Sequence, residues 1–156
     1  MGKHSRAARL RPVSVAVVAL VMLGGLGAAG TAQADEAVVA GTPCTERARA
    51  CVDLVAKHAW LIEDGVVVRG PVPVSVGSPG HETPAGDFRV EWKNTNHRSK
   101  EFDDAPMPFA VFFAQGGIAF HEGGLEGPSA GCVRLGHEDA TEFYDFLEID
   151  DPVQVR

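Results

Sequence analysis

Short apolar runs with a spacing of two residues, separated by glycine and proline, are the feature that most limits the fold of this chain. Such runs occur at 50–54, 59–62, 66–68, 88–92, 108–114, 118–121 and 153–155. Alternation predicts strands with one buried face, and Asp64-Gly65 between two runs is typical of a hairpin turn. Pro71 and Pro73 favour an edge position for the stretch that continues this pattern to Val76. The polar segment 94–108 is predicted to be a connection that lies near a site.

Only one segment has convincing helical spacing. Ala140, Phe143, Tyr144 and Leu147 recur at i, i+3, i+4 and i+7, which predicts a helix over 137–148. The sequence therefore predicts a mainly β domain with one main helix after Cys132.

The N-terminus has the pattern of an export signal. It contains four basic residues and no acidic one, then an apolar run over 13–30 and the small-residue triplet Ala32-Gln33-Ala34. We expect residues 1–34 to be a signal peptide cut after Ala34, residues 35–43 a flexible arm and residues 44–156 the folded domain. The alternative is an uncleaved N-terminal anchor. Either arrangement places the domain outside the cytoplasm, and cleavage would leave no stable membrane span.

Charge limits the partners of the mature domain. The whole chain carries a net charge of −7, and its 122 residues after position 34 carry −11. This acidity excludes a general nucleic-acid binder held by phosphate contacts. Composition names no function by itself.

Three cysteines are an odd number for an exported chain. Cys44 and Cys51 are the natural disulfide pair, and a loop this short would stabilise the domain by about 2.5 kcal/mol. Cys132 is then the free thiol. Taken alone, it would be interpreted as an inert core cysteine.

The residues around Cys132 favour a chemical role instead. His121 ends an alternating strand on the face opposite Ile118 and Phe120, and a glycine-rich loop separates it from Cys132. A thiol attacks as its thiolate, so an imidazole that accepts its proton makes it a nucleophile. A turn over 129–132 would also aim backbone N–H groups at one point, as an oxyanion hole requires. His137 is the one other histidine near enough in sequence to replace His121 as the base.

These residues resemble the YkuD-type L,D-transpeptidases of bacterial cell walls. The family signature is a histidine upstream of Ser/Thr-His-Gly-Cys, an apolar residue and arginine. The residues that match it are His121, Ser129, Gly131, Cys132, Val133 and Arg134. The segment 83–88, Thr-Pro-Ala-Gly-Asp-Phe, resembles a second family motif, and the likeness covers nearly all of residues 50–155.

The resemblance implies a compact β-sandwich-like catalytic domain in the cell wall that acts on peptidoglycan stem peptides as donor and acceptor. Cys132 would form a thioester, His121 would be the base, and Ser129 would brace the turn or orient His121. Backbone N–H groups at 130–132 would hold the oxyanion, while Arg134 would fix the loop or meet a substrate carboxylate. No metal or organic cofactor is expected. Penem-type β-lactams are implied as covalent inhibitors.

Two departures from the family pattern leave alternatives open. Ala130 stands where the family usually has histidine, and the interval between His121 and Cys132 is short. A thioester exposed to water would give an L,D-carboxypeptidase that releases terminal D-alanine. Loss of the motif histidine would also fit a non-catalytic module that binds peptidoglycan.

Overall fold

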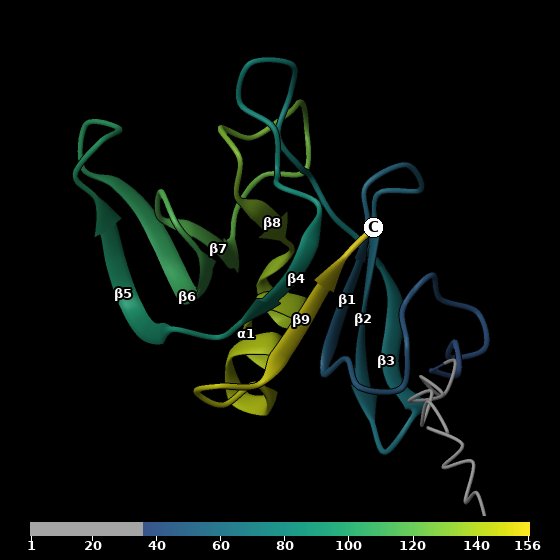
Figure 1. Ribbon diagram of the computed structural model, residues 1–156. Coiled ribbons are helices and arrows are strands. Elements are labelled where there is room, and N and C mark those ends of the chain that lie inside the picture. The colour runs from purple at the N-terminus through teal and green to yellow at the C-terminus, as the bar shows by residue number, and fades with distance from the viewer. Residues whose placement is uncertain (1–35) are drawn as a thin grey trace, which may run out of the picture. The chain divides into compact units, whose positions relative to one another are not determined.

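Two β-sheets and one helix make up the part of the chain that the computed structural model describes, residues 36–156. The first sheet has the order β3 (Val66–Pro73), β2 (His58–Glu63), β1 (Ala50–Asp53), β9 (Pro152–Val155) and β4 (Gly86–Arg89). The second has the order β5 (Trp92–Ser99), β6 (Ala105–Ala114), β7 (Ile118–Glu122) and β8 (Val133–Leu135). The helix α1 (His137–Phe146) lies between β8 and β9 in the chain (Figure 1). The predicted mainly β fold with one main helix is confirmed.

The structure describes only part of the N-terminal segment that was predicted to hold a signal peptide and a flexible arm. The expected signal peptide, residues 1–34, lies outside the described residues. Within residues 36–156, no helix is long and apolar enough to span a membrane. The segment predicted to be a flexible arm includes Val39, which is 5% exposed and packs with Trp60 and Ile62. Val38 also forms a β-bridge with Thr45, so this stretch lies against the domain.

The local turn and edge predictions match the structure. Asp64 and Gly65 have φ angles of 49° and 73°, the left-handed conformations that a type I′ hairpin turn requires between β2 and β3. The proline-containing strand β3 lies at the edge of its sheet. Val72, Val74 and Val76 are buried at alternate positions, as the period of two predicts.

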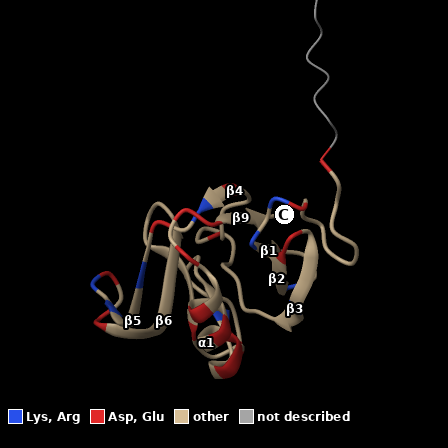
Figure 2. Cartoon of the chain, turned by 90° about the horizontal axis from the view of Figure 1, so that it is seen from below, with Lys and Arg blue, Asp and Glu red and all other residues tan. Residues whose placement is uncertain are grey.

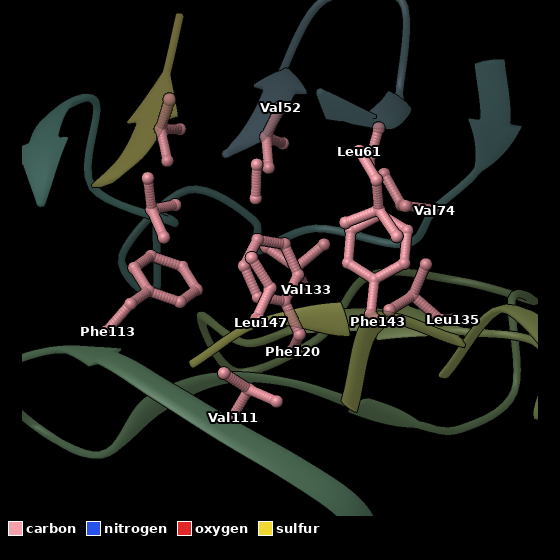
Figure 3. Close-up of a cluster of buried hydrophobic side chains, with 14 of the residues drawn as sticks. Val52, Leu61, Val74, Val111, Phe113, Phe120, Val133, Leu135, Phe143 and Leu147 are labelled. Carbon is pink, nitrogen blue, oxygen red and sulfur yellow. The ribbon is translucent and has the colours of Figure 1, made fainter. Parts of the chain in front are cut away.

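The main core fills the space between the two sheets (Figure 3). The first sheet contributes Val52 and Leu61, the second contributes Val111 and Phe120, and α1 contributes Phe143. The rings of Phe143 and Phe120 lie 5.2 Å apart, centroid to centroid. Phe143 therefore packs the helix against the second sheet and is fully buried.

We predict that Phe143→Ala lowers the free energy of unfolding by about 3–5 kcal/mol, because it removes a buried ring and leaves a cavity. Urea unfolding followed by circular dichroism measures this loss. Phe102→Ala is the matched control, since Phe102 is 50% exposed and its removal should cost less than about 0.5 kcal/mol. Equal losses in the two variants would contradict the packing role of Phe143.

Three strand predictions need correction. The polar segment 94–108 is not a connection: it holds most of β5, a turn, and the start of β6. Because β5 is an edge strand with mostly exposed side chains, it lacks apolar alternation, and its pairing with β6 defines it instead. The run 88–92 is also not one strand, since β4 ends at Arg89 and β5 begins at Trp92 in the other sheet. Finally, the sequence pattern does not predict β8, which has only three residues.

The helix is slightly shorter than predicted. It begins at His137 as expected but ends at Phe146, and Leu147 is its C-cap residue with extended dihedral angles. Leu147 is still buried, so the apolar spacing extends beyond the helix itself. Acidic residues, red in Figure 2, are frequent along α1. Asp139 in its first turn pairs with Arg69 of β3 at 2.7 Å.

Candidate active site

Parallel pairing of β7 with β8 brings Cys132 close to the strand that carries His121. Phe120 is in register with Val133, and His121 with Arg134. Cys132 directly precedes Val133, and its side chain packs on a buried cluster that includes Ala119. Ala119 and His121 are two residues apart on β7, so they share one face of the strand. Both Cys132 and His121 consequently line one cleft.

A constrained turn presents the thiol. Gly131 is buried with a φ of 115°, a conformation that side chains rarely adopt. A Cβ atom there would lie 2.7 Å from Cδ1 of Ile118. The Ser129 hydroxyl accepts a bond from the Gly131 N–H at 3.1 Å and donates to the Cys132 carbonyl. Ser129 therefore braces this turn.

Thr83 attaches a second loop to the same turn. Its hydroxyl donates to the Gly131 carbonyl at 2.8 Å and accepts from the Gly77 N–H at 2.9 Å. The side chain is 4% exposed, so both bonds are shielded from water. The sequence motif at 83–88 contains this residue, but only the structure shows that it bonds to the turn that carries Cys132.

The hydrogen bond at His121 selects one tautomer. Its Nδ1 lies 2.7 Å from the Glu122 carbonyl oxygen. A carbonyl only accepts, so Nδ1 carries the proton in neutral imidazole and Nε2 keeps a free lone pair. Burial lowers the pKa of His121 from its ordinary value of 6.5, and the charges of Arg134 and His97 lower it further, while the bond to Glu122 opposes them. His121 is therefore neutral, with a basic nitrogen, at neutral pH.

The thiol is also neutral in this resting state. Burial raises the pKa of Cys132 above its ordinary value of 9.0, although the Ala119 N–H and the Arg134 charge favour the thiolate. Its Sγ donates to the Gly117 carbonyl at 3.5 Å. Among the described residues, no hydrogen bond joins Sγ directly to the His121 ring. The pair can react by transferring the proton during attack rather than as a preformed ion pair.

The predicted oxyanion donors differ in availability. The Gly131 N–H is occupied by Ser129. The N–H of Cys132, by contrast, has no hydrogen-bond acceptor within residues 36–156. Ala130, which stands where the motif has histidine, is exposed on the rim. Cys132 is thus the better placed of the two N–H groups to bind a developing negative charge.

Arg134 fixes the neighbouring loop. Its Nη2 donates to the Ser75 hydroxyl at 2.9 Å and to the Gly127 carbonyl at 2.7 Å. Its Nε is buried and has no partner in the described structure. A Cβ at Gly123 would lie 2.8 Å from Cδ of Arg134, so the glycine-rich loop must pass close to this side chain. The loop-fixing contacts are therefore present.

Two cavities meet at the thiol. The large cleft has a volume of about 720 Å³ and is lined by residues that include His121, Arg134 and His137. The second cavity measures about 590 Å³ and is lined in part by Trp92 and His97. Cys132 and Ala130 line both. The second cavity was not predicted from the sequence. Its wall includes residues of β5, and the polar pattern of 94–108 gives no sign of a strand there.

The other two cysteines and His137 lie outside the catalytic turn. Cys44 and Cys51 form a disulfide on the outer side of the first sheet, with Cα atoms 5.9 Å apart, and Cys132 is free. His137 is exposed at the start of α1 and its Nδ1 lies 2.9 Å from a Glu122 carboxylate oxygen. Between residues 36 and 156, no group of three potential metal ligands is assembled.

Comparison with known proteins identifies the family. The family model of the YkuD L,D-transpeptidase catalytic domain matches residues 47–155, and the chain belongs to this family. It is 31% identical over 115 residues to the probable L,D-transpeptidase 3 of Mycobacterium tuberculosis, a match that covers 60% of this chain and 40% of that protein.

Solved structures share the fold. An L,D-transpeptidase from Stackebrandtia nassauensis matches with a TM-score of 0.65 and 31% identity, over 69% of this chain and 54% of that one. The L,D-transpeptidase LdtMt1 in complex with imipenem has a TM-score of 0.63 and 22% identity, over 69% and 57% of the two chains, which supports the fold alone. The present chain spans about half of the length of the relatives it matches, or less.

Proposed function

We propose that this protein is an exported L,D-transpeptidase that crosslinks peptidoglycan stem peptides through a thioester on Cys132. The observation that carries the proposal is a free thiol and a neutral imidazole with an available Nε2 on the wall of one cleft. Family membership supports the reaction class. The signal-like N-terminus supports an extracytoplasmic site of action in the cell wall.

In the first half of the reaction, a donor stem lies in the large cleft. His121 takes the thiol proton as Sγ attacks the carbonyl between the diamino acid and the terminal D-alanine. The Cys132 N–H stabilises the oxyanion, and collapse breaks the C–N bond. D-Alanine leaves with the proton from His121, so the thioester forms with no net gain or loss of protons. The Arg134 side chain lines this cleft, where its guanidinium would meet a donor carboxylate.

The second cavity favours a transpeptidase over a hydrolase. Because Cys132 lines both cavities, a donor held in one leaves the other free for the acceptor stem. The acceptor amine then attacks the thioester carbonyl and displaces sulfur. Exposed Ala130 favours the second candidate, an L,D-carboxypeptidase, because water also reaches this position.

Product analysis tests the proposal. Purified tetrapeptide stems are incubated with the protein and the products are identified by mass spectrometry. A transpeptidase gives crosslinked dimers, whereas a carboxypeptidase gives tripeptides without dimers. Unchanged stems would overturn both and favour a binding module. Imipenem, which is bound in the LdtMt1 structure, is a useful second probe, since we propose that penem-type β-lactams acylate Cys132.

We predict a broad pH plateau for thioester formation. The reactive state needs neutral His121, whose pKa lies below 6.5, and protonated Cys132, whose pKa lies above 9.0. Because the pKa of His121 is lowered, the rate should fall on the acid side only below pH 6.5. Because the pKa of Cys132 is raised, the rate should fall on the alkaline side only above pH 9.0. Between about pH 7 and 8.5, the single-turnover rate should change less than about twofold.

A variant of His137 tests whether the acid limb of the pH profile belongs to His121. His137 lines the same cleft but is exposed. His137→Gln should keep the acid limb where it is in the wild type. An acid limb centred above pH 6.5, or one that disappears in His137→Gln, would contradict the assignment to His121.

A further inference from the structure

His97 lines the second cavity, and its ring nitrogens have no hydrogen-bond partner among the described residues. It lies on β5 opposite Met107 of β6, and it is only partly exposed. Its ring is held edge-on against Trp92 at 5.3 Å and Phe112 at 4.9 Å. Trp92 and Phe112 stack with centroids 3.8 Å apart, so the ring position is well defined.

This aromatic cluster is continuous with the packing of the thiol. Phe112 belongs to the buried cluster on which Cys132 packs, together with Met107 and Ala119. His97 lines the second cavity and His121 lines the large cleft, while Cys132 lines both. The two imidazoles therefore line different cavities that share the thiol.

The chemistry of the acceptor gives a role to a base on its side of the thiol. A free alkyl amine is almost entirely an ammonium ion at neutral pH, and it must lose two protons to become an amide nitrogen. One of these protons ends on the Cys132 sulfur, which leaves as the thioester breaks. The other proton ends in water, and a base on the acceptor side can take it from the ammonium before the amine attacks.

We propose that His97 is the catalytic base that deprotonates the acceptor ammonium in the second cavity. This inference rests on the proposed transpeptidase function. His97 takes the first proton, and the neutral amine attacks the thioester carbonyl. The new C–N bond forms, the C–S bond breaks, and the second proton passes through His121 to the sulfur. His97 then releases its proton to water. The Trp92 and Phe112 rings hold the imidazole and offer an apolar floor to the acceptor stem.

The test separates the two half-reactions. D-Alanine release in a single turnover reports thioester formation, and dimer formation against acceptor concentration reports aminolysis. His97→Phe keeps an aromatic ring but removes the base. We expect its kcat for dimer formation to fall about 100-fold with an acceptor KM within about threefold of wild type, while D-alanine release slows far less.

His58→Phe is the matched control, because His58 also packs edge-on against a tryptophan, Trp60 at 6.1 Å, but on the first sheet. It should crosslink within about twofold of wild type. His97→Gln, which replaces the ring by a polar side chain, should show the same aminolysis defect as His97→Phe. A chemical rescue is also expected: hydroxylamine, largely unprotonated at neutral pH, should cleave the thioester of His97→Phe at the wild-type rate.

The outcomes are distinguishable. Dimer formation by His97→Phe within about threefold of wild type would overturn the inference, as would a loss confined to acceptor KM. A hydroxylamine reaction slowed as much as the stem reaction would also overturn it, since that result indicates a structural defect. If the wild-type protein releases no D-alanine, the proposed function itself fails.

Discussion

Replacing Cys132 by alanine is expected to abolish crosslinking, with a loss of at least about 10⁴-fold in dimer formation. The thiol is the free nucleophile at the junction of both cavities, and no other cysteine is free in the described part of the chain. Cys132 is only partly buried and its side chain packs at the margin of a small cluster. Removing Sγ should therefore leave the fold intact.

The measurement is the yield of dimers and tripeptides from tetrapeptide stems, with circular dichroism and thermal melting as the control for folding. Cys132→Ser is the matched variant, because it keeps the size of the side chain and loses most of its nucleophilicity. An undiminished yield of dimers from a folded Cys132→Ala protein would end the thioester mechanism.

The second large effect is expected at His121. His121→Asn keeps an N–H that can donate to the Glu122 carbonyl, as Nδ1 does at 2.7 Å, but it removes the basic nitrogen. Because the thiol is neutral in the resting state, its attack depends on that base. Thioester formation should slow by about 10²–10⁴-fold.

Two comparisons make the His121 result specific. His137→Gln should cost far less, since its exposed ring is bonded to Glu122 and is not needed to activate the thiol. The double variant His121→Asn, Cys132→Ala should be no worse than Cys132→Ala, because residues that act as a unit are not additive. A larger loss in His137→Gln than in His121→Asn would make His137 the base.

The parts of the fold that could be predicted from sequence have strong local signals. The hairpin at Asp64-Gly65 needs left-handed dihedrals, and the buried valines at 72, 74 and 76 alternate. By contrast, β5 could not be predicted because an edge strand with polar and mostly exposed side chains leaves no apolar pattern. The strand β8 is too short to show a period, and only its pairing with β7 defines it.

In the candidate site, too, features with a local sequence signal could be predicted and features that depend on distant segments could not. Cys132 and His121 could be selected from sequence because a thiol and an imidazole flank a glycine-rich loop, and alternation put His121 on the face opposite Phe120. The structure has this arrangement, with Phe120 in the core and His121 in the cleft. The occupied Gly131 N–H, the Thr83 bonds and the aromatic setting of His97 could not be predicted, because each depends on segments far apart in the chain.

The most direct test of the thioester mechanism is intact-protein mass spectrometry of the protein mixed with a tetrapeptide stem and quenched in acid. We expect a covalent adduct with the mass of the stem lacking its terminal D-alanine, mapped by proteolysis to the peptide that contains Cys132. The adduct should be absent from Cys132→Ala. Dimers formed without any adduct, or an adduct on another residue, would contradict the mechanism.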